Sequence, residues 1–424
     1  MDKKFKKITL KNGLRVILVP QKESLSATVL VLVEAGSKYE TKNINGLSHF
    51  LEHMCFKGTT KRPTALDIAS ELESIGASYN AFTGQEYTGY YAKVRTSHLN
   101  IALDVVSDIY LNQLFDQNEI NKERGVIIEE INMHEDQPMD KVGDLFMELM
   151  YGNQPAGWTI TGKKENIEKI TREDFIEYHG KNYVASSTIV VVAGKFDEEK
   201  LMAEVKNKFA GISSGKKHKK VKTKGIQNKP AIKVEHKKTD QTHIILGVRA
   251  FSLFDKRRYA LEVLADVLGG GMSSRLFQKV RGELGAAYYV YASADMSTDS
   301  GFLSVSAGID HNKIDIVLQS IMDELKKLSK EKVGDKELSR AKEHMTGGLA
   351  IGLETSSSLA SYYGGQEVMK EKIETPEEVI KKIQAVKASD IMKVAKDILK
   401  NKNLNLAVIG PFDDKKRFEK ILKI

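Results

Sequence analysis

The chain has 424 residues, of which 41% are hydrophobic and 29% charged, and its formal net charge is +8. This length predicts more than one domain, and the apolar share excludes a wholly disordered protein. The longest apolar stretches, at residues 27–33 and 189–193, are far shorter than the ~20 residues of a membrane span. The single cysteine, Cys55, excludes an internal disulfide framework. We therefore expect a cytoplasmic protein that does not enter a membrane.

The first predicted element is a β-hairpin over residues 5–20, because Asn12-Gly13 is a strong turn dipeptide. Further strands are expected at residues 28–35, 89–94 and 301–308. Apolar periodicity predicts helices at residues 46–56, 65–75, 117–135 and 257–268. Strands that form hairpins and alternate with helices favour an α+β fold, with mixed or antiparallel sheets and helices packed on one face.

The helix predicted at residues 46–56 carries a histidine pair in the sequence His49-Phe-Leu-Glu52-His53. His49 and His53 are four residues apart and share one helix face, so both imidazoles can bind one metal ion. This HxxEH pattern is the inverse of HExxH and is typical of inverzincins. Two histidines suit zinc, and Glu52, beside that face, can serve as a general base. The alternative is an exposed histidine pair, but apolar flanking residues favour a packed helix.

A catalytic zinc site needs a third protein ligand, which we expect from the helix predicted at residues 117–135. Glu123 and Glu130 are seven residues apart and share a face of that helix. Glu130 could bind the metal, and Glu123, two turns away, could support the site without binding it. The buried stripe of the helix is expected at Val126, Ile127 and Ile131.

Two other residues of this helix are alternative ligands. Glu129 is adjacent to Glu130 but points about 100° away on a helical wheel. His134 has a suitable side chain, although we rank it low. Each glutamate could instead lie on a solvated helix face with no metal nearby.

A lysine-rich segment at residues 211–230 is the best candidate linker, because it is polar, contains glycines and lacks apolar periodicity. It contains six of the lysines that make the chain basic, Lys216, Lys217, Lys219, Lys220, Lys222 and Lys224. Few aromatic residues lie among them, so we expect a solvated linker and not a nucleic-acid or membrane patch. The predicted domains are a catalytic domain at 1–212, a linker at 213–229 and a metal-free homologous domain at 230–424.

The ends of the two halves are similar in sequence. SSTIVVVAGKFD precedes the linker and NLNLAVIGPFDD ends the second half, and each follows a predicted helix. Asp174 matches Asp390 and Gly194 matches Gly410 with the same offset of 216 residues. This shared offset predicts a duplication and two structurally similar α+β domains. HxxEH does not recur after residue 230, so the second domain is expected to lack the metal.

These motifs resemble the pitrilysin family of zinc peptidases, which includes processing peptidases. The resemblance is carried by HFLEH, by ERGVIIEE at residues 123–130, and by three longer blocks: KNGLRVILVP, IGASYNAFTGQEYTGYYAKV and GGGMSSRLFQKVRGELGAAYYVYA. It covers essentially the whole chain, with bacterial processing-peptidase-like proteins closest in size. It implies one zinc ion per chain bound by His49, His53 and Glu130, with Glu52 as general base and Glu123 in support.

The resemblance also implies two elements that bind substrate. The segment at residues 78–83 reads as an edge strand, and in the family this strand pairs with the substrate backbone, which would involve Asn80, Ala81 and Phe82. Arg281 and Tyr288 match an arginine and a tyrosine that contact substrate carbonyl groups. From the residues alone, Arg281 would be a surface cation and Tyr288 a core aromatic.

The resemblance implies a zinc metalloendopeptidase that cleaves peptides or unfolded polypeptide segments inside an enclosed chamber. Long family members hold four such domains, so a chain with two is expected to form a homodimer or a heterodimer with a related subunit. The alternatives are a catalytically silent scaffold subunit of the same fold, a nucleic-acid-binding protein that uses the lysine run, and a metal-dependent hydrolase of another amide.

Overall fold

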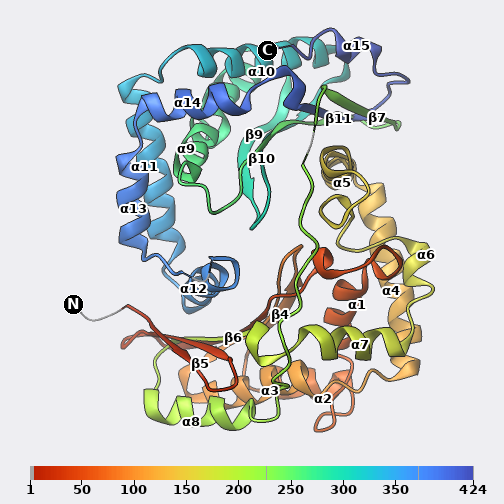
Figure 1. Cartoon of the computed structure of the whole chain (residues 1–424), viewed down its shortest axis with the longest axis vertical. Coiled ribbons are helices and arrows are strands. Elements are labelled where there is room, and N and C mark those ends of the chain that lie inside the picture. The colour runs from red at the N-terminus through yellow and green to blue at the C-terminus, as the bar shows by residue number, and fades with distance from the viewer. Residues whose placement is uncertain (1–3, 226, 371, 424) are drawn as a thin grey trace. The chain divides into compact units, whose positions relative to one another are not determined.

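The protein is described by a computed structural model that covers residues 4–225, 227–370 and 372–423 (Figure 1). It forms two compact units. Unit 1 comprises the N-terminal segment up to Asn132, together with Trp158–Val221 and Ile351–Glu374. Unit 2 comprises Met133–Gly157, Lys222–Ala350 and the segment from Thr375 onward. Each unit therefore combines segments from both sides of the lysine-rich segment. Within the described ranges, every helix is too short or too polar to cross a bilayer.

Unit 1 is built on a six-stranded mixed sheet with the order β1-β2-β6-β3-β5-β4. The strands are β1 (Lys6–Thr9), β2 (Arg15–Pro20), β3 (Ser26–Val33), β4 (Ser78–Thr83), β5 (Thr88–Arg95) and β6 (Thr188–Gly194). The predicted hairpin is confirmed, because β1 pairs antiparallel with β2 across a turn in which Gly13 has φ 93°. β2 runs parallel to β6, whereas β3 is antiparallel to both β6 and β5.

One face of this sheet is covered by helices that carry most of the core of unit 1. These helices are α1 (Leu47–Met54), α2 (Ala65–Ser74), α3 (Leu99–Leu111), α4 (Gln117–Asp136), α7 (Arg172–Asn182) and α8 (Glu198–Lys208), and a short helix α6 (Lys164–Ile167) precedes α7. Alternate residues of β3, including Val29 and Val31, are fully buried against the helices. The predicted helices at 46–56, 65–75 and 117–135 correspond to α1, α2 and α4.

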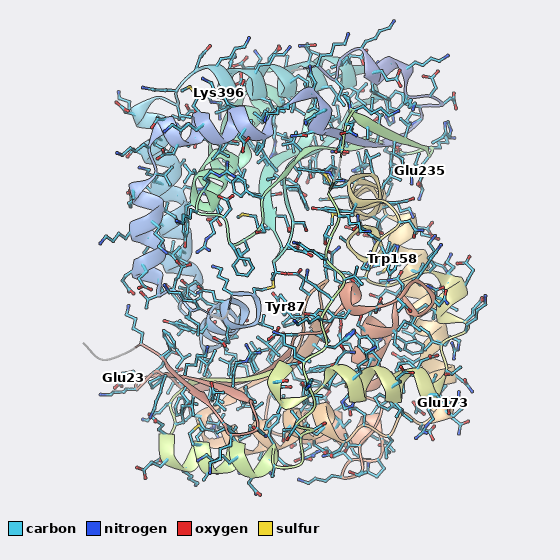
Figure 2. All side chains as sticks on the ribbon, in the orientation of Figure 1. Glu23, Tyr87, Trp158, Glu173, Glu235 and Lys396 are labelled. Atoms are coloured by element: carbon cyan, nitrogen blue, oxygen red, sulfur yellow. The ribbon has the colours of Figure 1, made fainter. Side chains whose placement is uncertain are left out.

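The second face of the same sheet is covered by α12 (Ser356–Lys370), which comes from the C-terminal part of the sequence. Leu30 and Leu32 of β3 pack with Tyr363 of this helix, and Tyr87, labelled in Figure 2, packs at the edge of the same cluster. Gly364 allows a close approach, because a Cβ there would lie 2.8 Å from a methyl group of Leu32. We predicted helices on only one face of the sheet, so α12 is an addition to that prediction.

Charged and polar contacts also hold α12 on the sheet. The fully buried carboxylate of Glu367 accepts a hydrogen bond from Arg15 of β2 at 3.1 Å and pairs with Lys7 of β1 at 2.8 Å. Near the start of the helix, the hydroxyls of Ser356 and Thr28 are 2.9 Å apart. A buried carboxylate is tolerated only when it is paired in this way, so these contacts fix where α12 docks.

Unit 2 has a five-stranded mixed sheet with the order β7-β11-β8-β10-β9. The strands are β7 (Ala231–His236), β8 (Thr242–Ala250), β9 (Ala287–Met296), β10 (Gly301–Ile309) and β11 (Leu404–Gly410). The helices are α5 (Pro138–Tyr151), α9 (Arg258–Gly269), α10 (Ile314–Lys330), α11 (Asp335–Gly352), α13 (Pro376–Ala385), α14 (Ala388–Ile398) and α15 (Lys416–Glu419), with a π-helical turn at Phe277–Glu283. A single core joins one sheet face to α9, α10 and α14.

The opposite face of this sheet is covered by α5, which comes from the N-terminal part of the sequence. Leu145 and Phe146 of α5 pack with Ala407 and Ile409 of β11. Gly247 of β8 leaves room for the ring of Phe146, because a Cβ at that position would lie 2.7 Å from it. Each unit thus receives one helix encoded in the other half of the chain.

The duplication is visible in equivalent elements. Helix α7 and strand β6 have the same bounds as α14 and β11 after the offset of 216 residues. Asp174 and Asp390 each occupy the third position of a helical capping box. In both sheets the repeated strand lies parallel to one neighbour and antiparallel to the other. The prediction of two similar α+β folds is confirmed, while the exact domain boundaries stay a prediction.

The lysine-rich segment differs from the expected solvated linker. Lys217 forms an ion pair with Glu34, and Lys220 pairs with Glu86 at 2.9 Å, all within unit 1. His218 lies 3.2 Å from the side-chain oxygen of Asn182. These contacts anchor the segment because Glu34 and Glu86 are buried carboxylates that need counter-charges.

Candidate metal centre

Helix α1 begins at a tight turn that is fixed by a buried carboxylate. Gly46 precedes the helix with φ 104°, a left-handed conformation that suits glycine. No side chain at this position caps the helix. Instead Glu40 accepts hydrogen bonds from the backbone N–H groups of Gly46 at 2.9 Å and Ser48 at 2.7 Å, and from the Ser48 hydroxyl. Burial raises the pKa of Glu40 to about 7 although these donors oppose the shift. Glu40 thus fixes the first turn of the helix.

The two predicted histidine ligands lie on one face of α1. The ring centroids of His49 and His53 are 4.8 Å apart, with the rings inclined at 66°. Their neighbours Phe50 and Leu51 are fully buried, so the helix is packed as predicted and only this face is partly open. The geometry is what a spacing of four residues on a helix requires.

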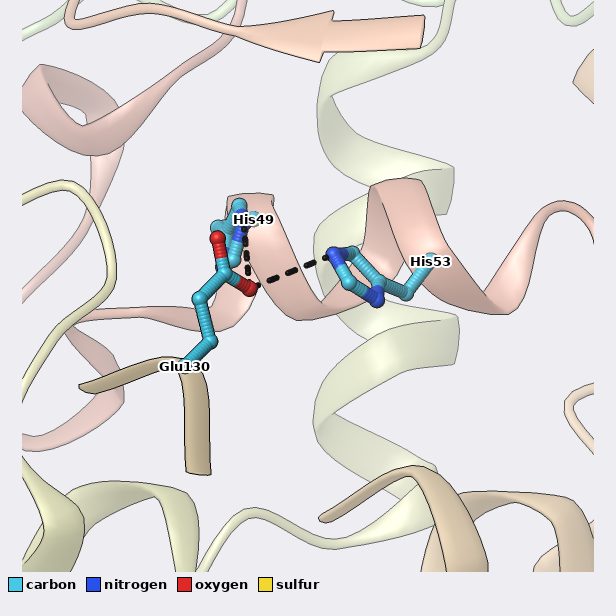
Figure 3. Close-up of side chains that lie close together, drawn as sticks. All are labelled: His49, His53 and Glu130. Carbon is cyan, nitrogen blue, oxygen red and sulfur yellow. Dashed lines mark ion pairs between the residues drawn. The ribbon is translucent and has the colours of Figure 1, made fainter. Parts of the chain in front are cut away.

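Glu130 reaches the same point from α4 (Figure 3). Its Oε2 atom lies 3.5 Å from Nε2 of His49 and 3.7 Å from Nε2 of His53. Ligand atoms of these three residues all lie within 4.8 Å of one another, so the group could hold a metal ion. Ligand atoms ~2.0–2.2 Å from a tetrahedral zinc ion would be roughly 3.4 Å apart. The distances from Glu130 to the two imidazole nitrogens are close to that value.

The alternative ligands on α4 are not in this group. Glu129 is exposed, and its carboxylate accepts a hydrogen bond from Asn132 at 3.3 Å. His134, one turn beyond Glu130, is also outside it. One detail of the prediction for α4 is wrong: Val126 is 50% exposed, whereas Ile127 and Ile131 are buried as expected. The buried stripe is narrower than predicted, because the side of α4 that carries Val126 faces solvent.

Glu123 lies beside His53, not among the three ligand atoms. Its Oε1 is 2.9 Å from Nδ1 of His53, and its Oε2 is 2.5 Å from the Lys57 ammonium. Burial alone would raise the pKa of Glu123, but these two contacts lower it overall. Burial lowers the pKa of His53, but the hydrogen bond with Glu123 and the charge of Glu52 raise it overall. A carboxylate on the far nitrogen leaves Nε2 directed at Glu130, the arrangement usual for a metal-binding histidine.

Glu52 is held at the same face by strand β4. The hydroxyl of Thr83, the last residue of β4, donates a 2.6 Å hydrogen bond to Oε2 of Glu52. Burial raises the pKa of Glu52, while this hydrogen bond and the charge of His53 oppose the shift. A partly buried carboxylate near three converging ligand atoms is well placed to accept a proton.

Strand β4 is at the edge of its sheet, as predicted. Gly84 N–H donates to Tyr87 O at 2.9 Å in the turn that joins β4 to β5. Bonded pairs alternate along an antiparallel ladder, so the backbone groups of Tyr79, Ala81 and Thr83 point outward from the sheet. The Ala81 N–H group donates to the side chain of Asn80 at 2.9 Å. The outer side of β4 therefore presents backbone groups to another strand.

Arg281 and Tyr288 belong to unit 2. The Arg281 guanidinium lies over the ring of Phe277 at 5.0 Å. Tyr288 is 74% exposed at the start of β9, so reading it as a core aromatic is wrong. It is exposed because β9 is an edge strand whose side chains alternate between the core and solvent. The predicted substrate contacts of Arg281, Tyr288, Asn80, Ala81 and Phe82 stay predictions.

Three supporting residues escaped the sequence analysis: Glu40, Lys57 and Thr83. Lys57 had a usable signal, because it lies one helical turn after His53 and could pair with an acidic partner. The sequence signal for Glu40 was weaker: a helix that begins after glycine lacks a capping side chain at that position, so another residue must cap it. Thr83 had none, because its contact depends on how β4 packs against α1.

Comparison with known proteins identifies the family. The family model "Insulinase (Peptidase family M16)" matches residues 15–164, and "Peptidase M16 inactive domain" matches residues 169–345. The uncharacterized zinc protease YmxG of Bacillus subtilis is 37% identical over 96% of this chain and 98% of its own length. The chain belongs to peptidase family M16. The predicted resemblance to the pitrilysin family is therefore confirmed.

Three further proteins match along nearly their full length. An uncharacterized zinc protease of Mycobacterium leprae is 37% identical over 98% of this chain and 94% of its own. A protease from Helicobacter pylori has a TM-score of 0.90 at 25% identity, with 96% of this chain and 99% of that chain covered. A chain of complex III from Candida albicans has a TM-score of 0.84 at 18% identity, covering 99% of this chain and 100% of that chain, and so shares the M16 fold.

Proposed function

We propose that the protein is a zinc metalloendopeptidase that hydrolyses peptides or unfolded polypeptide segments. The observation that carries this proposal is the convergence of His49, His53 and Glu130 from two separate helices on one point. Homologues named zinc proteases and membership of family M16 support it. Two imidazoles and one carboxylate are a common ligand set of catalytic zinc, with one position left open.

The donor set fits one zinc ion per chain. The Glu130 carboxylate lies 3.5 and 3.7 Å from the two imidazole nitrogens, close to the spacing of two ligands on one tetrahedral ion. Glu123 holds His53 by its other ring nitrogen. A zinc ion bound by these residues would supply Lewis-acid chemistry, acting on water and on the carbonyl of the peptide bond. We assign His49, His53 and Glu130 as ligands and Glu123 as the residue that orients His53.

Glu52 is proposed as the general base. Its carboxylate takes a proton from the attacking water and delivers it to the nitrogen of the leaving amine as the peptide bond breaks. Thr83 keeps the carboxylate oriented through the hydrogen bond to Oε2. This contact also links the base to strand β4, where the substrate is proposed to bind.

The substrate is proposed to add as a strand to β4, next to Asn80, Ala81 and Phe82. The outward backbone groups of this edge strand can pair with any extended peptide, and such pairing selects little for sequence. The strands of a folded protein are held within their own sheets, so peptides and unfolded segments are the expected substrates. Arg281 and Tyr288 are proposed to bind substrate carbonyl groups.

The remaining proposals concern assembly and location. Long members of the family hold four such domains and this chain holds two. We therefore propose that two chains form an enclosed chamber, as a homodimer or with a related subunit, in the manner of processing peptidases. The protein is proposed to act in the cytoplasm, without a nucleic-acid or membrane partner.

The proposed function is tested by metal removal and replacement. We expect the purified chain to contain one zinc ion by mass spectrometry and to cleave an unstructured peptide. A chelator should abolish cleavage, and zinc added back should restore it. A chain without bound zinc that cleaves nothing would instead support a silent scaffold subunit, whereas zinc-dependent hydrolysis of other amides but not peptides would indicate a different hydrolase.

Glu123→Ala should weaken zinc binding without removing a ligand. His53 would lose the carboxylate that holds its ring, and such losses lower metal affinity ~10- to 100-fold. Competition with a chromogenic chelator measures the zinc affinity directly. Glu119→Ala, a change at a half-buried position on the same helix that lies outside the ligand group, is the control and should bind zinc like the wild type. Equal affinities for the two variants would contradict the supporting role of Glu123.

A further inference from the structure

The turn between β4 and β5 is joined to helix α1 by the segment from Gly36 to Glu40. Ser37 N–H donates to Gly84 O at 3.3 Å, and Lys38 N–H donates to Gln85 O at 2.8 Å. A Cβ on Gly36 would lie 2.2 Å from Gly84 O, so the two backbones are in close contact. At its other end this segment carries Glu40, which caps α1. One short segment thus touches both the β4–β5 turn and helix α1.

A buried carboxylate lies at this junction. Glu86, within the β4–β5 turn, is 6% exposed, and its Oε1 atom is 3.3 Å from the ammonium of Lys38 and 2.9 Å from that of Lys220. Lys38 is itself 1% exposed and belongs to the segment from Gly36 to Glu40. Lys220 comes from the lysine-rich segment, more than a hundred residues away in sequence. Two cations from different segments therefore meet on one carboxylate of the turn.

A second contact of the lysine-rich segment lies on the neighbouring strand. Lys217 pairs with Glu34, which directly follows β3 and also pairs with Arg15. The Thr88 hydroxyl, at the start of β5, donates to Ala35 O at 2.9 Å, next to Glu34. The lysines that alternate with these two differ from them, because Lys216 and Lys219 are exposed. Only one side of the segment faces the junction.

We propose that Lys217 and Lys220 are positioning residues, which hold the β4–β5 turn and through it the edge strand β4 in the place where a peptide pairs with it. Lys220 acts on the turn through Glu86, and Lys217 acts on the end of β3 through Glu34. The turn begins directly after Thr83, the residue that orients Glu52. The expected change in KM rests on the proposed function, whereas the expected change in hydrogen exchange does not.

The lysine-rich segment also leads out of unit 1, since Lys222 is the first residue of unit 2 in this part of the chain. Lys220 is therefore the last charged anchor before the chain leaves the unit. An anchor at this point keeps motions of the following segment from reaching the turn. Two of the six lysines of the basic run thereby have a use within their own chain that does not involve nucleic acid.

The test compares two double variants with the same change in charge. Lys217→Gln with Lys220→Gln removes both anchors, whereas Lys216→Gln with Lys219→Gln removes two exposed lysines from the same segment. In the first variant we expect hydrogen exchange of the amides of β4, of residues 84–87 and of the end of β3 to be about tenfold faster, with β1, β2 and β6 unchanged. The control should exchange like the wild type. Lysine-to-arginine changes at 217 and 220 should restore the slow exchange.

The kinetic readout uses the zinc-loaded chain and an extended peptide. We expect the anchor variant to raise KM about fivefold with kcat nearly unchanged, because strand pairing is weakened while the zinc ligands stay in place. Equal exchange and equal KM in the two double variants would overturn the proposal. So would a loss of protection throughout the sheet, which would show general support of the fold. If the wild-type chain cleaves no peptide, the proposed function fails, and hydrogen exchange alone decides this inference.

Discussion

Glu52→Gln is expected to lower kcat for peptide hydrolysis by about 10³-fold while the protein keeps its zinc. The substitution preserves the shape of the side chain and can still accept the hydrogen bond from Thr83. It removes the group that accepts a proton, and the loss of a general base costs ~10²- to 10⁴-fold in rate. The three ligand atoms come from other residues, so zinc binding should be unaffected.

The measurement pairs zinc analysis with peptide hydrolysis under saturating substrate. Glu129→Gln is the matched control, because Glu129 is exposed, lies outside the ligand group and carries the same charge. It should hydrolyse the peptide at the wild-type rate. A Glu52→Gln protein that holds zinc and remains fully active would show that another group is the base.

Gly364→Leu is expected to lower the free energy of unfolding by about 3 kcal/mol, because it forces a side chain into a closed contact. A Cβ at this position already lies 2.8 Å from a Leu32 methyl and 2.9 Å from a Val191 methyl. Both partners are buried in the sheet beneath α12. The larger side chain must push the helix away from that face.

The adjacent glycine provides the control. A Cβ at Gly365 meets nothing within 4 Å, and leucine is a better helix former than glycine by up to ~1 kcal/mol. Gly365→Leu should therefore be neutral or slightly stabilising. Urea unfolding followed by circular dichroism measures both variants. Equal stability of the two would mean that α12 does not dock on the sheet as described.

The sequence analysis succeeded where the signal is local. His49 and His53 are four residues apart, and a packed helix leaves them only one shared face, so their convergence follows from spacing alone. Spacing alone did not identify Glu130, because α4 carries several acidic residues that could bind the metal. The family pattern selected Glu130, and the structure brings it within 3.5 Å of the His49 ring.

The features that were missed depend on contacts between distant parts of the chain. Periodicity identifies an amphipathic segment but does not say which sheet it covers, so the docking of α12 on the first sheet was not predictable. The same reason applies to Lys217 and Lys220. A run of lysines has the composition of a solvated segment, and only the position of buried Glu34 and Glu86 reveals that two of them are anchored.

The docking of α12 has a consequence for how the chain folds during synthesis. The ribosome must add more than 150 residues after β6 before this helix emerges. Until then the apolar face of the first sheet, including Ile17, Leu30 and Val191, has no cover. Such uncovered surface favours aggregation of the nascent protein. Translation that stops after residue 350 should therefore yield an insoluble product, even though every proposed zinc ligand has been made.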